Sequence, residues 1–369
     1  MQTVLISGGG IAGPVLAHWL RRRGYSPTVI ERAAGPRPGG QAVDIRGVAL
    51  DVMARTGLLE RAAAVRTRMR GMSVLDPLGR ELSRSTEETY SSGRLDSDDI
   101  ELLREDLVGM VWEHTRGDAE YVFGDCITSL EEDGGGVRAG FARGPARTFD
   151  LVVGADGLHS AVRRLAFGPE DGFVHHLGSH LSVFGAENFL ALEDWQLWLR
   201  DGDAGFGIMP VRGNTELRIA FGFESGPLPE EVRRGDALRH LVADRLASLR
   251  WEGRRLARAA RDAPDFHCDA VAQVRMDGWS RGRVVLLGDA GYCPSPLSGQ
   301  GTSLALAGAY VLADCLGGAG GDHGAAFAEY ERRMRPFVAL NQALATENAG
   351  GPAAESSVAR AKGALALDG

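Results

Sequence analysis

The first thirteen residues contain the feature that most constrains the fold, a short apolar segment that runs directly into a glycine-rich turn. Residues 3–7 read TVLIS, and an amphipathic stretch over residues 11–23 follows. The turn between them contains Gly8, Gly10, Ile11, Ala12 and Gly13. Glycines at this spacing allow a tight turn, a close approach of the backbone to a pyrophosphate, and packing of the helix on the strand. The segment therefore predicts a strand, a phosphate-binding turn and a helix.

A second strand is expected over residues 28–31, which end in Glu31 and are followed by Arg32. Glu31 lies 18 residues after Gly13. An acid at this place accepts hydrogen bonds from the ribose of a bound dinucleotide. It also disfavours a 2′-phosphate there, because two anions repel each other. The opening βαβ unit thus predicts a dinucleotide site, with Arg32 beside it.

Two later segments repeat the combination of apolar strand, glycine and acid. Residues 150–154 lead into Asp156 and Gly157, and residues 283–287 lead into Asp289. The second segment continues into a proline-containing loop and an apolar helix, and its turn residues are Gly288, Pro296, Gly299, Gln300, Gly301 and Thr302. Free N–H groups at the start of this helix suit an anionic ligand. Asp156 has an alternative role, because an acid after a strand can simply cap a turn.

The remaining pattern predicts how the chain is organised. Residues 32–115 are expected to be mostly helical, and residues 229–261 form a second helical stretch. Further strands are expected at residues 120–123, 127–130, 137–141, 205–211, 216–223 and 268–276. We therefore predict an α/β protein (α+β overall). A Rossmann-like domain is assembled discontinuously from residues 1–172 and 277–369, and an antiparallel β-sheet substrate domain is inserted at residues 173–276.

Composition excludes several classes of protein. The chain has 41 basic and 49 acidic residues and no basic block, which argues against nucleic acid or an anionic membrane as a partner. Its longest apolar stretch, residues 303–313, is about half a membrane span. The four cysteines show no CxxC pair, which suits a reducing cytoplasm. His175, His176 and His180 lack the company of other metal ligands, so no metal is expected. We expect a cytoplasmic monomer or homodimer.

The three motifs, in this order and at about these distances, resemble those of the FAD-dependent aromatic hydroxylases. These are the para-hydroxybenzoate hydroxylase-like, group A flavoprotein monooxygenases, which include tetracycline-modifying and polyketide hydroxylases. The resemblance extends from Met1 to about Gln342. It implies FAD as cofactor, NADPH or NADH as transient co-substrate, and transfer of one oxygen atom of O2, through a flavin 4a-hydroperoxide, to an aromatic or polycyclic substrate.

The resemblance also implies roles for individual residues. Arg46, Pro296 and Gly299 match positions at the flavin ring and are the candidate catalytic environment. Arg104 matches a helix arginine that reaches the cofactor, and Asp289 matches the acid that binds the ribityl chain. For either arginine taken alone, a surface salt bridge is the alternative. The full set of expected cofactor contacts is Gly8, Gly10, Ile11, Ala12, Gly13, Glu31, Arg32, Arg46, Arg104, Asp156, Gly157, Gly288, Asp289, Pro296, Gly299, Gln300, Gly301 and Thr302.

The second nucleotide needs a place, because the chain has one GxGxxG pattern only. NAD(P)H is therefore expected to dock transiently on the FAD domain, with Asp156, Arg163 and Arg46 as candidate contacts. Many relatives have a histidine shortly after the GD aspartate, whereas this chain has Tyr292. A hydrogen bond from that histidine, if the family requires one, is in doubt here.

The substrate contacts are expected on the inserted sheet. Trp198, Phe206, Met209 and Phe221 are the candidates, although only one side-chain parity of each strand can face the pocket. Alternative activities are Baeyer–Villiger-type oxygenation, halogenation or reduction on the same scaffold, or flavin binding without catalysis. Flavin halogenases carry a WxWxIP motif and an active-site lysine. This chain lacks that motif, and its single lysine, Lys362, lies in a tail that is expected to fray.

Overall fold

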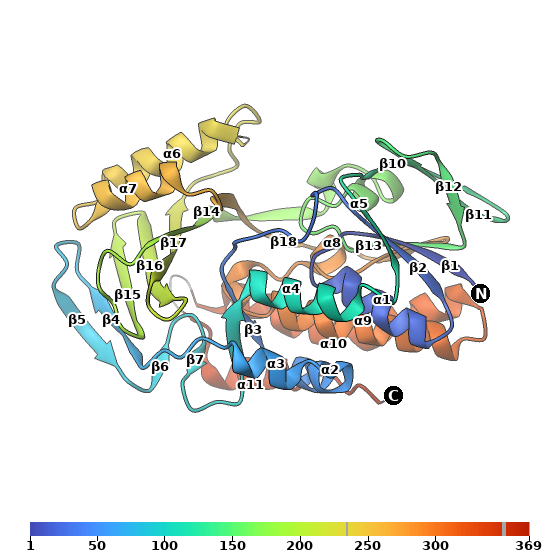
Figure 1. The fold of residues 1–369 in the computed structure, drawn as a ribbon, viewed down its shortest axis with the longest axis horizontal. Coiled ribbons are helices and arrows are strands. Elements are labelled where there is room, and N and C mark those ends of the chain that lie inside the picture. Colours follow the sequence, from blue (N-terminus) through green and yellow to red (C-terminus); the bar gives the residue numbers. More distant parts are fainter. Residues whose placement is uncertain (234, 349–351, 369) are drawn as a thin grey trace.

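The computed structural model describes residues 1–233, 235–348 and 352–368, and it contains two main sheets with helices packed on them (Figure 1). The first sheet has six strands, in the order β19-β20-β13-β1-β2-β9. Their bounds are Ser280–Arg281, Val284–Leu286, Leu151–Gly154, Thr3–Ser7, Ser26–Glu31 and Glu120–Phe123. The strand β1 pairs in parallel with both β2 and β13, so the ends of the three motif strands meet at one edge. The predicted Rossmann-like arrangement is confirmed.

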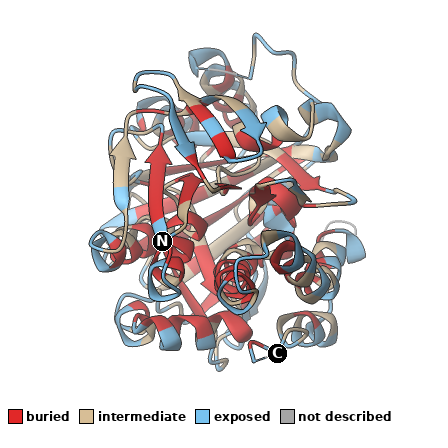
Figure 2. Cartoon of the chain, turned by 90° about the vertical axis from the view of Figure 1, so that its right-hand side faces the viewer, coloured by how far each residue is buried: buried red, intermediate tan, exposed pale blue. Residues whose placement is uncertain are grey.

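Helices cover the first sheet because its central strands are apolar on both faces. Val4, Leu5 and Ile6 of β1 are fully buried, and Figure 2 shows the buried residues concentrated in these strands and the helices next to them. The principal helices of this layer are α1 (Ala12–Arg22), α4 (Arg104–Thr115), α9 (Gly301–Gly318) and α10 (His323–Glu347). Smaller elements are α5 (Ala161–Ala166), η1 (Glu170–Gly172), α8 (Asp289–Tyr292), η2 (Pro296–Ser298) and the sheet of β10 (Ile127–Asp133), β11 (Gly136–Phe141) and β12 (Arg147–Phe149).

The second sheet has seven strands, in the order β18-β14-β17-β16-β15-β4-β5. Their bounds are His267–Val274, Val174–Glu187, Glu216–Glu224, Ala204–Val211, Trp195–Asp201, Gly71–Leu75 and Glu81–Ser85. One face packs against α6 (Gly235–Ala247) and α7 (Gly253–Asp262), which form the predicted helical stretch as two helices. The opposite, inner face carries the residues that contact segments of the first domain.

The expectation of a mostly helical segment over residues 32–115 is wrong. Besides α2 (Val48–Thr56), α3 (Leu59–Ala64) and the whole of α4, the segment forms six strands. These are β3 (Ala42–Ile45), β4, β5, β6 (Glu88–Thr89), β7 (Gly93–Arg94) and β8 (Ile100–Leu103). Because β4 and β5 extend the second sheet, residues 71–85 belong to it by pairing, although the predicted boundary put them in the first domain.

The C-terminal segment is docked, so the expectation of fraying is also wrong. The helix α11 (Glu355–Lys362) packs along α10, and Ala361 and Leu367 are buried. Asp368 forms a two-pronged ion pair with Arg55 of α2, at 2.8 and 2.9 Å. Lys362 Nζ lies 3.0 Å from a carboxylate oxygen of Asp99.

Candidate active site

The glycine-rich turn is shaped as its sequence predicts. A Cβ atom at Gly8 would lie 2.3 Å from the carbonyl oxygen of Ala155, and one at Gly13 would lie 2.0 Å from that of Gly8. A Cβ at Gly10 would meet nothing within 4 Å, so the backbone there faces open space. Ile11, the N-cap of α1, makes no side-chain cap hydrogen bond. The first N–H groups of α1 are therefore available to phosphate oxygens.

Glu31 is held beside this turn by backbone amides. Its two carboxylate oxygens accept hydrogen bonds from the N–H groups of Gly9 at 2.8 Å and Ala33 at 2.9 Å. The residue is 9% exposed. Each oxygen keeps a second lone pair, which is what a ribose diol needs. The neighbouring Arg32 is exposed, and no hydrogen bond ties it to the turn within the described part of the chain.

Arg104 brings two of the motifs together from a third segment. It opens α4, and its environment contains both Glu31 and Asp289. Burial and the nearby Arg37 lower the pKa of Arg104, whereas the two carboxylates raise it. Burial also raises the pKa of Asp289 at the start of α8. Among the described residues the Arg104 guanidinium has no hydrogen-bonded partner, so an acid–arginine–acid arrangement stands open to a ligand.

The loop before α9 closes the same region. Ser295 and Gly299 both adopt positive φ, +81° and +63°, on either side of the short helix that begins at Pro296. Gln300 then caps α9, and both polar atoms of its buried side chain lack a partner among the described residues. Gly301 and Thr302 follow as the first turn of α9. Unpaired buried amide atoms are costly, so their place at a helix N-terminus indicates a polar ligand.

Arg46 reaches this loop from the other side. A Cβ at Gly299 would lie 3.6 Å from Arg46 Nη1, and the Arg46 amide donates to Ser303 Oγ of α9 at 3.0 Å. Its guanidinium forms a buried ion pair with Asp44, at 2.9 Å. Burial is the main cause that raises the pKa of Asp44 to about 7. The alternative of a surface salt bridge does not hold for Arg46, because both side chains are only 8% exposed.

Comparison with known proteins places this site in a family. The sequence matches the FAD-binding domain family over residues 1–342. The chain belongs to this family. A protein of Mycobacterium tuberculosis described as uncharacterized is 50% identical, over 96% of this chain and 95% of its own. A flavin-dependent monooxygenase of Legionella longbeachae is 37% identical, over 92% of this chain and 86% of its own.

A solved structure agrees with this assignment. The crystal structure of tetracycline destructase Tet(55) superposes with a TM-score of 0.87 and 34% identity, and it covers 100% of this chain and 99% of its own. FAD is the cofactor of this chain, and the chain is an FAD-dependent monooxygenase. Use of NAD(P)H is implied by the family. The open turn at Gly10, the unpaired Gln300 amide and the Glu31–Arg104–Asp289 arrangement fit this cofactor.

The DG motif has a structural role in this FAD domain. The Asp156 carboxylate accepts hydrogen bonds from Ser160 Oγ at 2.5 Å and from the N–H groups of Ala161 at 2.9 Å and Val162 at 3.2 Å. The alternative of a turn cap therefore describes its contacts. Gly157 adopts a φ of +81°, which a glycine accommodates without strain.

Arg163, a candidate for docking NAD(P)H, is fully buried. It donates to the carbonyl oxygens of Ala290 at 2.9 Å and Leu158 at 2.6 Å. These bonds join the DG and GD turns. Because the guanidinium is engaged in joining these two turns, Arg163 is not free to contact the nicotinamide nucleotide.

The substitution of Tyr292 for the usual histidine is explained by packing. The Tyr292 hydroxyl hydrogen-bonds the Tyr330 hydroxyl of α10 at 2.7 Å, and its ring centroid lies 4.6 Å from that of Trp279. The side chain is 1% exposed and points into the core. Its hydroxyl is therefore engaged within the core.

The candidate substrate residues separate by sheet face. Phe206 and Phe221 lie in the core under α6 and α7, where helices cover them, so they are not placed to contact a substrate. Trp198 and Met209 lie on the inner face, because Trp198 pairs with Gly207 in the register and adjacent residues alternate. Met209 packs against Leu103 of β8, next to the first domain.

Sequence reasoning missed three residues of this region. Asp44, Glu101 and Gln196 are buried, and each lies between apolar or aromatic neighbours in its strand. A lone polar side chain in such a strand was the available signal, because a buried polar group needs a partner.

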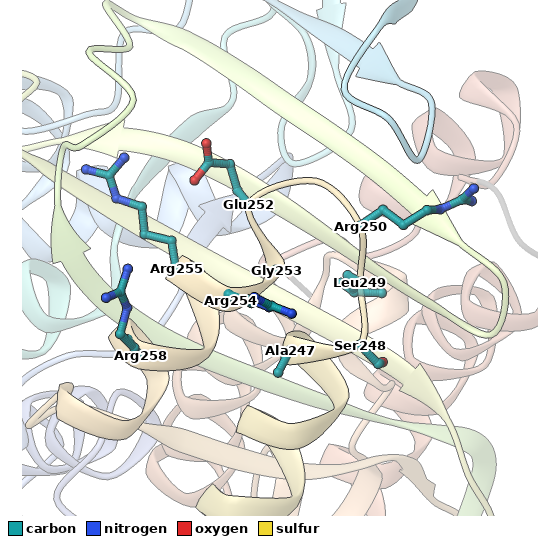
Figure 3. A pocket seen from close by; sticks show the side chains of 9 residues that line it. All are labelled: Ala247, Ser248, Leu249, Arg250, Glu252, Gly253, Arg254, Arg255 and Arg258. Atoms are coloured by element: carbon teal, nitrogen blue, oxygen red, sulfur yellow. The ribbon is translucent and has the colours of Figure 1, made fainter.

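Other surfaces carry less information on chemistry. A cavity of about 590 Å³ lies where α6 turns into α7, on the far side of the second sheet, and four arginines are among the residues that line it (Figure 3). Among the described residues no group of His, Cys, Asp and Glu is arranged to hold a metal ion. Within the same residues, none of the helices combines the length and apolar character that a membrane crossing requires.

Proposed function

We propose that this FAD-dependent monooxygenase hydroxylates a planar phenolic or polycyclic aromatic compound with NADPH or NADH as reductant. The observation that supports the proposal most is a set of hydrogen bonds that joins Trp198 of the second sheet to Arg46 of the first domain. Trp198 Nε1 donates to Gln196 Oε1 at 3.0 Å, Gln196 Nε2 donates to Ser91 Oγ at 2.7 Å, and Arg46 Nη2 donates to the Ser91 carbonyl oxygen at 3.2 Å. Tetracycline destructases are structural relatives, which supports a fused-ring phenolic substrate.

The residues of the FAD domain bind and orient the cofactor. The amides around Gly10 and the start of α1 receive the pyrophosphate, Glu31 accepts from the ribose, and Asp289 accepts from the ribityl chain. Arg104 neutralises the charge that accumulates between these two acids. When FAD is bound, it supplies the electron transfer and oxygen activation that the side chains cannot.

The substrate side is built for a flat ring. The Trp198 indole lies over Gly207, where a Cβ would come within 2.6 Å of the ring. Tyr90 meets it edge-on, with 5.4 Å between ring centroids, and Trp198 Nε1 donates to Gln196 Oε1 at 3.0 Å. A polycyclic substrate can stack on such a surface, and each aromatic contact contributes about 0.5–1.5 kcal/mol beyond burial. The ring is thereby positioned toward the Arg46–Gly299 region and shielded from water.

NAD(P)H is proposed to dock transiently at the FAD site rather than in a domain of its own. Arg46 is the candidate contact that we keep, because it lies beside the Gly299 loop, whereas the contacts of Asp156 and Arg163 lie in the DG and GD turns. The proposed monomer or homodimer and the cytoplasmic location stay proposals, the latter supported by four cysteines that are free in the structure.

The test is rapid mixing of the purified holoenzyme with NADPH or NADH over a panel of simple phenols, flavonoids and tetracycline. We expect NAD(P)H oxidation that is stimulated by a fused-ring phenol and coupled to a gain of one oxygen atom. The Trp198→Ala variant should raise KM for that compound, and the matched control Trp251→Ala, which lies on the outer face, should not. Oxidation that no panel member stimulates, or a product without added oxygen, would refute the proposal.

A further inference from the structure

The ribbon of β3 and β8 carries an unusual concentration of buried carboxylates. Asp44 and Glu101 stand directly opposite each other in its antiparallel register, and they are 8% and 5% exposed. Asp99, which precedes β8, adds a third carboxylate whose side chain is 10% exposed and whose charge acts on Asp44. Like charges opposite each other in a sheet are destabilising unless they are neutralised. Glu101 is partly stabilised by Thr67 Oγ1, which donates to it at 2.5 Å.

Two cations face these three carboxylates. Arg46 pairs with Asp44 at 2.9 Å, and Lys362 of α11 donates to both oxygens of Asp99 at 3.0 and 3.2 Å. Arg46 is thereby left to Asp44, to the Ser91 carbonyl oxygen, which accepts from its Nη2 at 3.2 Å, and to the loop at Gly299. This assignment of one cation to each carboxylate depends on Lys362, which lies more than 260 positions after Asp99 in the sequence.

The end of α11 is fixed directly on the segment that follows Arg46. A Cβ at Gly47 would lie 2.3 Å from the Lys362 carbonyl oxygen. Ala361, the preceding residue, is buried, and Asn341 Nδ2 donates to its carbonyl oxygen at 3.4 Å. Lys362 thus contacts the Arg46 segment through its backbone and the acidic cluster through its side chain.

We propose that Lys362 is a positioning residue of the flavin site, which neutralises Asp99 so that Arg46 stays aligned toward Gly299 and the flavin. The inference rests on the proposed place of Arg46 beside the flavin. Without the lysine, an unpaired and nearly buried carboxylate would remain within reach of Asp44, the ion-pair partner of Arg46. Such a group is costly, and it either binds a proton or recruits the nearest cation. Recruitment would draw the guanidinium away from the flavin.

The test uses holoenzyme and measures the midpoint potential of bound FAD by anaerobic dithionite titration, which needs neither NAD(P)H nor substrate. In Lys362→Met we expect a more negative potential than in the wild type at pH 8. Positive charge near the flavin stabilises its reduced, anionic form, and the variant has less of that charge there. The groups that face Asp44 in this arrangement are Arg46, Glu101 and Asp99, with Lys362 behind Asp99.

Three further variants separate positioning from simple loss of structure. Lys362→Arg should restore the potential, and Arg360→Met, an exposed residue of the same helix, should leave it unchanged. Asp99→Asn combined with Lys362→Met should also restore it, because the unpaired charge is gone. An undocked helix would not be rescued in this way.

Each outcome decides the matter. A wild-type potential in Lys362→Met, or a loss that neither Lys362→Arg nor the double variant restores, would overturn the inference. Failure of substrate oxygenation would refute the proposed function without affecting this titration, so the two results are distinguishable.

Discussion

Replacing Glu31 by glutamine tests the adenosine end of the site with little change in shape. The carboxylate now accepts two backbone hydrogen bonds, from Gly9 and Ala33, at 2.8 and 2.9 Å. A glutamine side chain has one acceptor oxygen and one NH2 donor group. It can therefore accept from only one of these amides, and its NH2 group would lie against the other backbone N–H. The ribose also loses a charged acceptor.

The magnitude follows from the number of charged hydrogen bonds. Each is worth about 1.5–3 kcal/mol, so loss of the ribose bond alone weakens FAD binding by roughly 10- to 150-fold. The unsatisfied buried amide should also lower the free energy of unfolding of the FAD-free protein by about 1–3 kcal/mol.

The assay is titration of FAD-free protein with FAD, followed by quenching of flavin fluorescence, together with urea unfolding. Glu113→Gln is the matched control, because Glu113 is exposed on α4 and forms a surface ion pair with Arg61. Wild-type FAD affinity in Glu31→Gln would refute the assignment of Glu31 to the ribose.

Four further predictions follow from individual contacts. Gly13→Ala places a Cβ 2.0 Å from the Gly8 carbonyl oxygen and should lower the melting temperature and abolish FAD retention, as circular dichroism and absorbance at purification will show. Arg46→Ala should slow flavin reduction by NADPH more than it weakens FAD binding, and an unchanged reductive step would remove that role. The hydrogen bonds that the His159 ring donates to Asp269 and then to Glu170 are the main causes that raise the pKa of His159 to about 10. The stabilisation this histidine gives relative to His159→Gln should therefore be complete below about pH 6.5 and decline as the pH rises towards 10 in unfolding titrations. Turnover in bromide should yield an oxygenated product without bromine, since the only lysine, Lys362, is held by Asp99; a brominated product would count against hydroxylation.

The motif-bearing part of the fold could be predicted because its signals are local. The strands β1 and β13 have apolar centres and lead through a glycine into a helix or an acid, and the structure places them side by side. The convergence of Glu31, Arg104 and Asp289 was implied by family resemblance rather than by spacing, and their facing environments agree with it.

The parts that could not be predicted depend on partners that are distant in the sequence. The strands β3 and β8 are each only four residues long. The segment between them in the sequence lies partly in the other sheet. Alternation alone does not reveal which side chains of β16 face the site, because both sets contain large apolar residues. Phe206 lies under helices α6 and α7, and Met209 lies on the opposite face. The docking of α11 and the residues after it rests on contacts with distant segments, among them the ion pairs Lys362–Asp99 and Asp368–Arg55 and the close approach to Gly47, which carry no periodic signal.

The central claim is that the residues around Arg46, Gly299 and Trp198 direct one oxygen atom of O2 onto an aromatic ring. Turnover of the holoenzyme with NADPH and a stimulating phenol under ¹⁸O2, with the product analysed by mass spectrometry, tests this claim most directly. The account predicts one ¹⁸O atom per product molecule, bound to the ring, and no label when ¹⁸O is supplied as water. Incorporation from water, or NADPH oxidation with the phenol recovered unchanged, would contradict it.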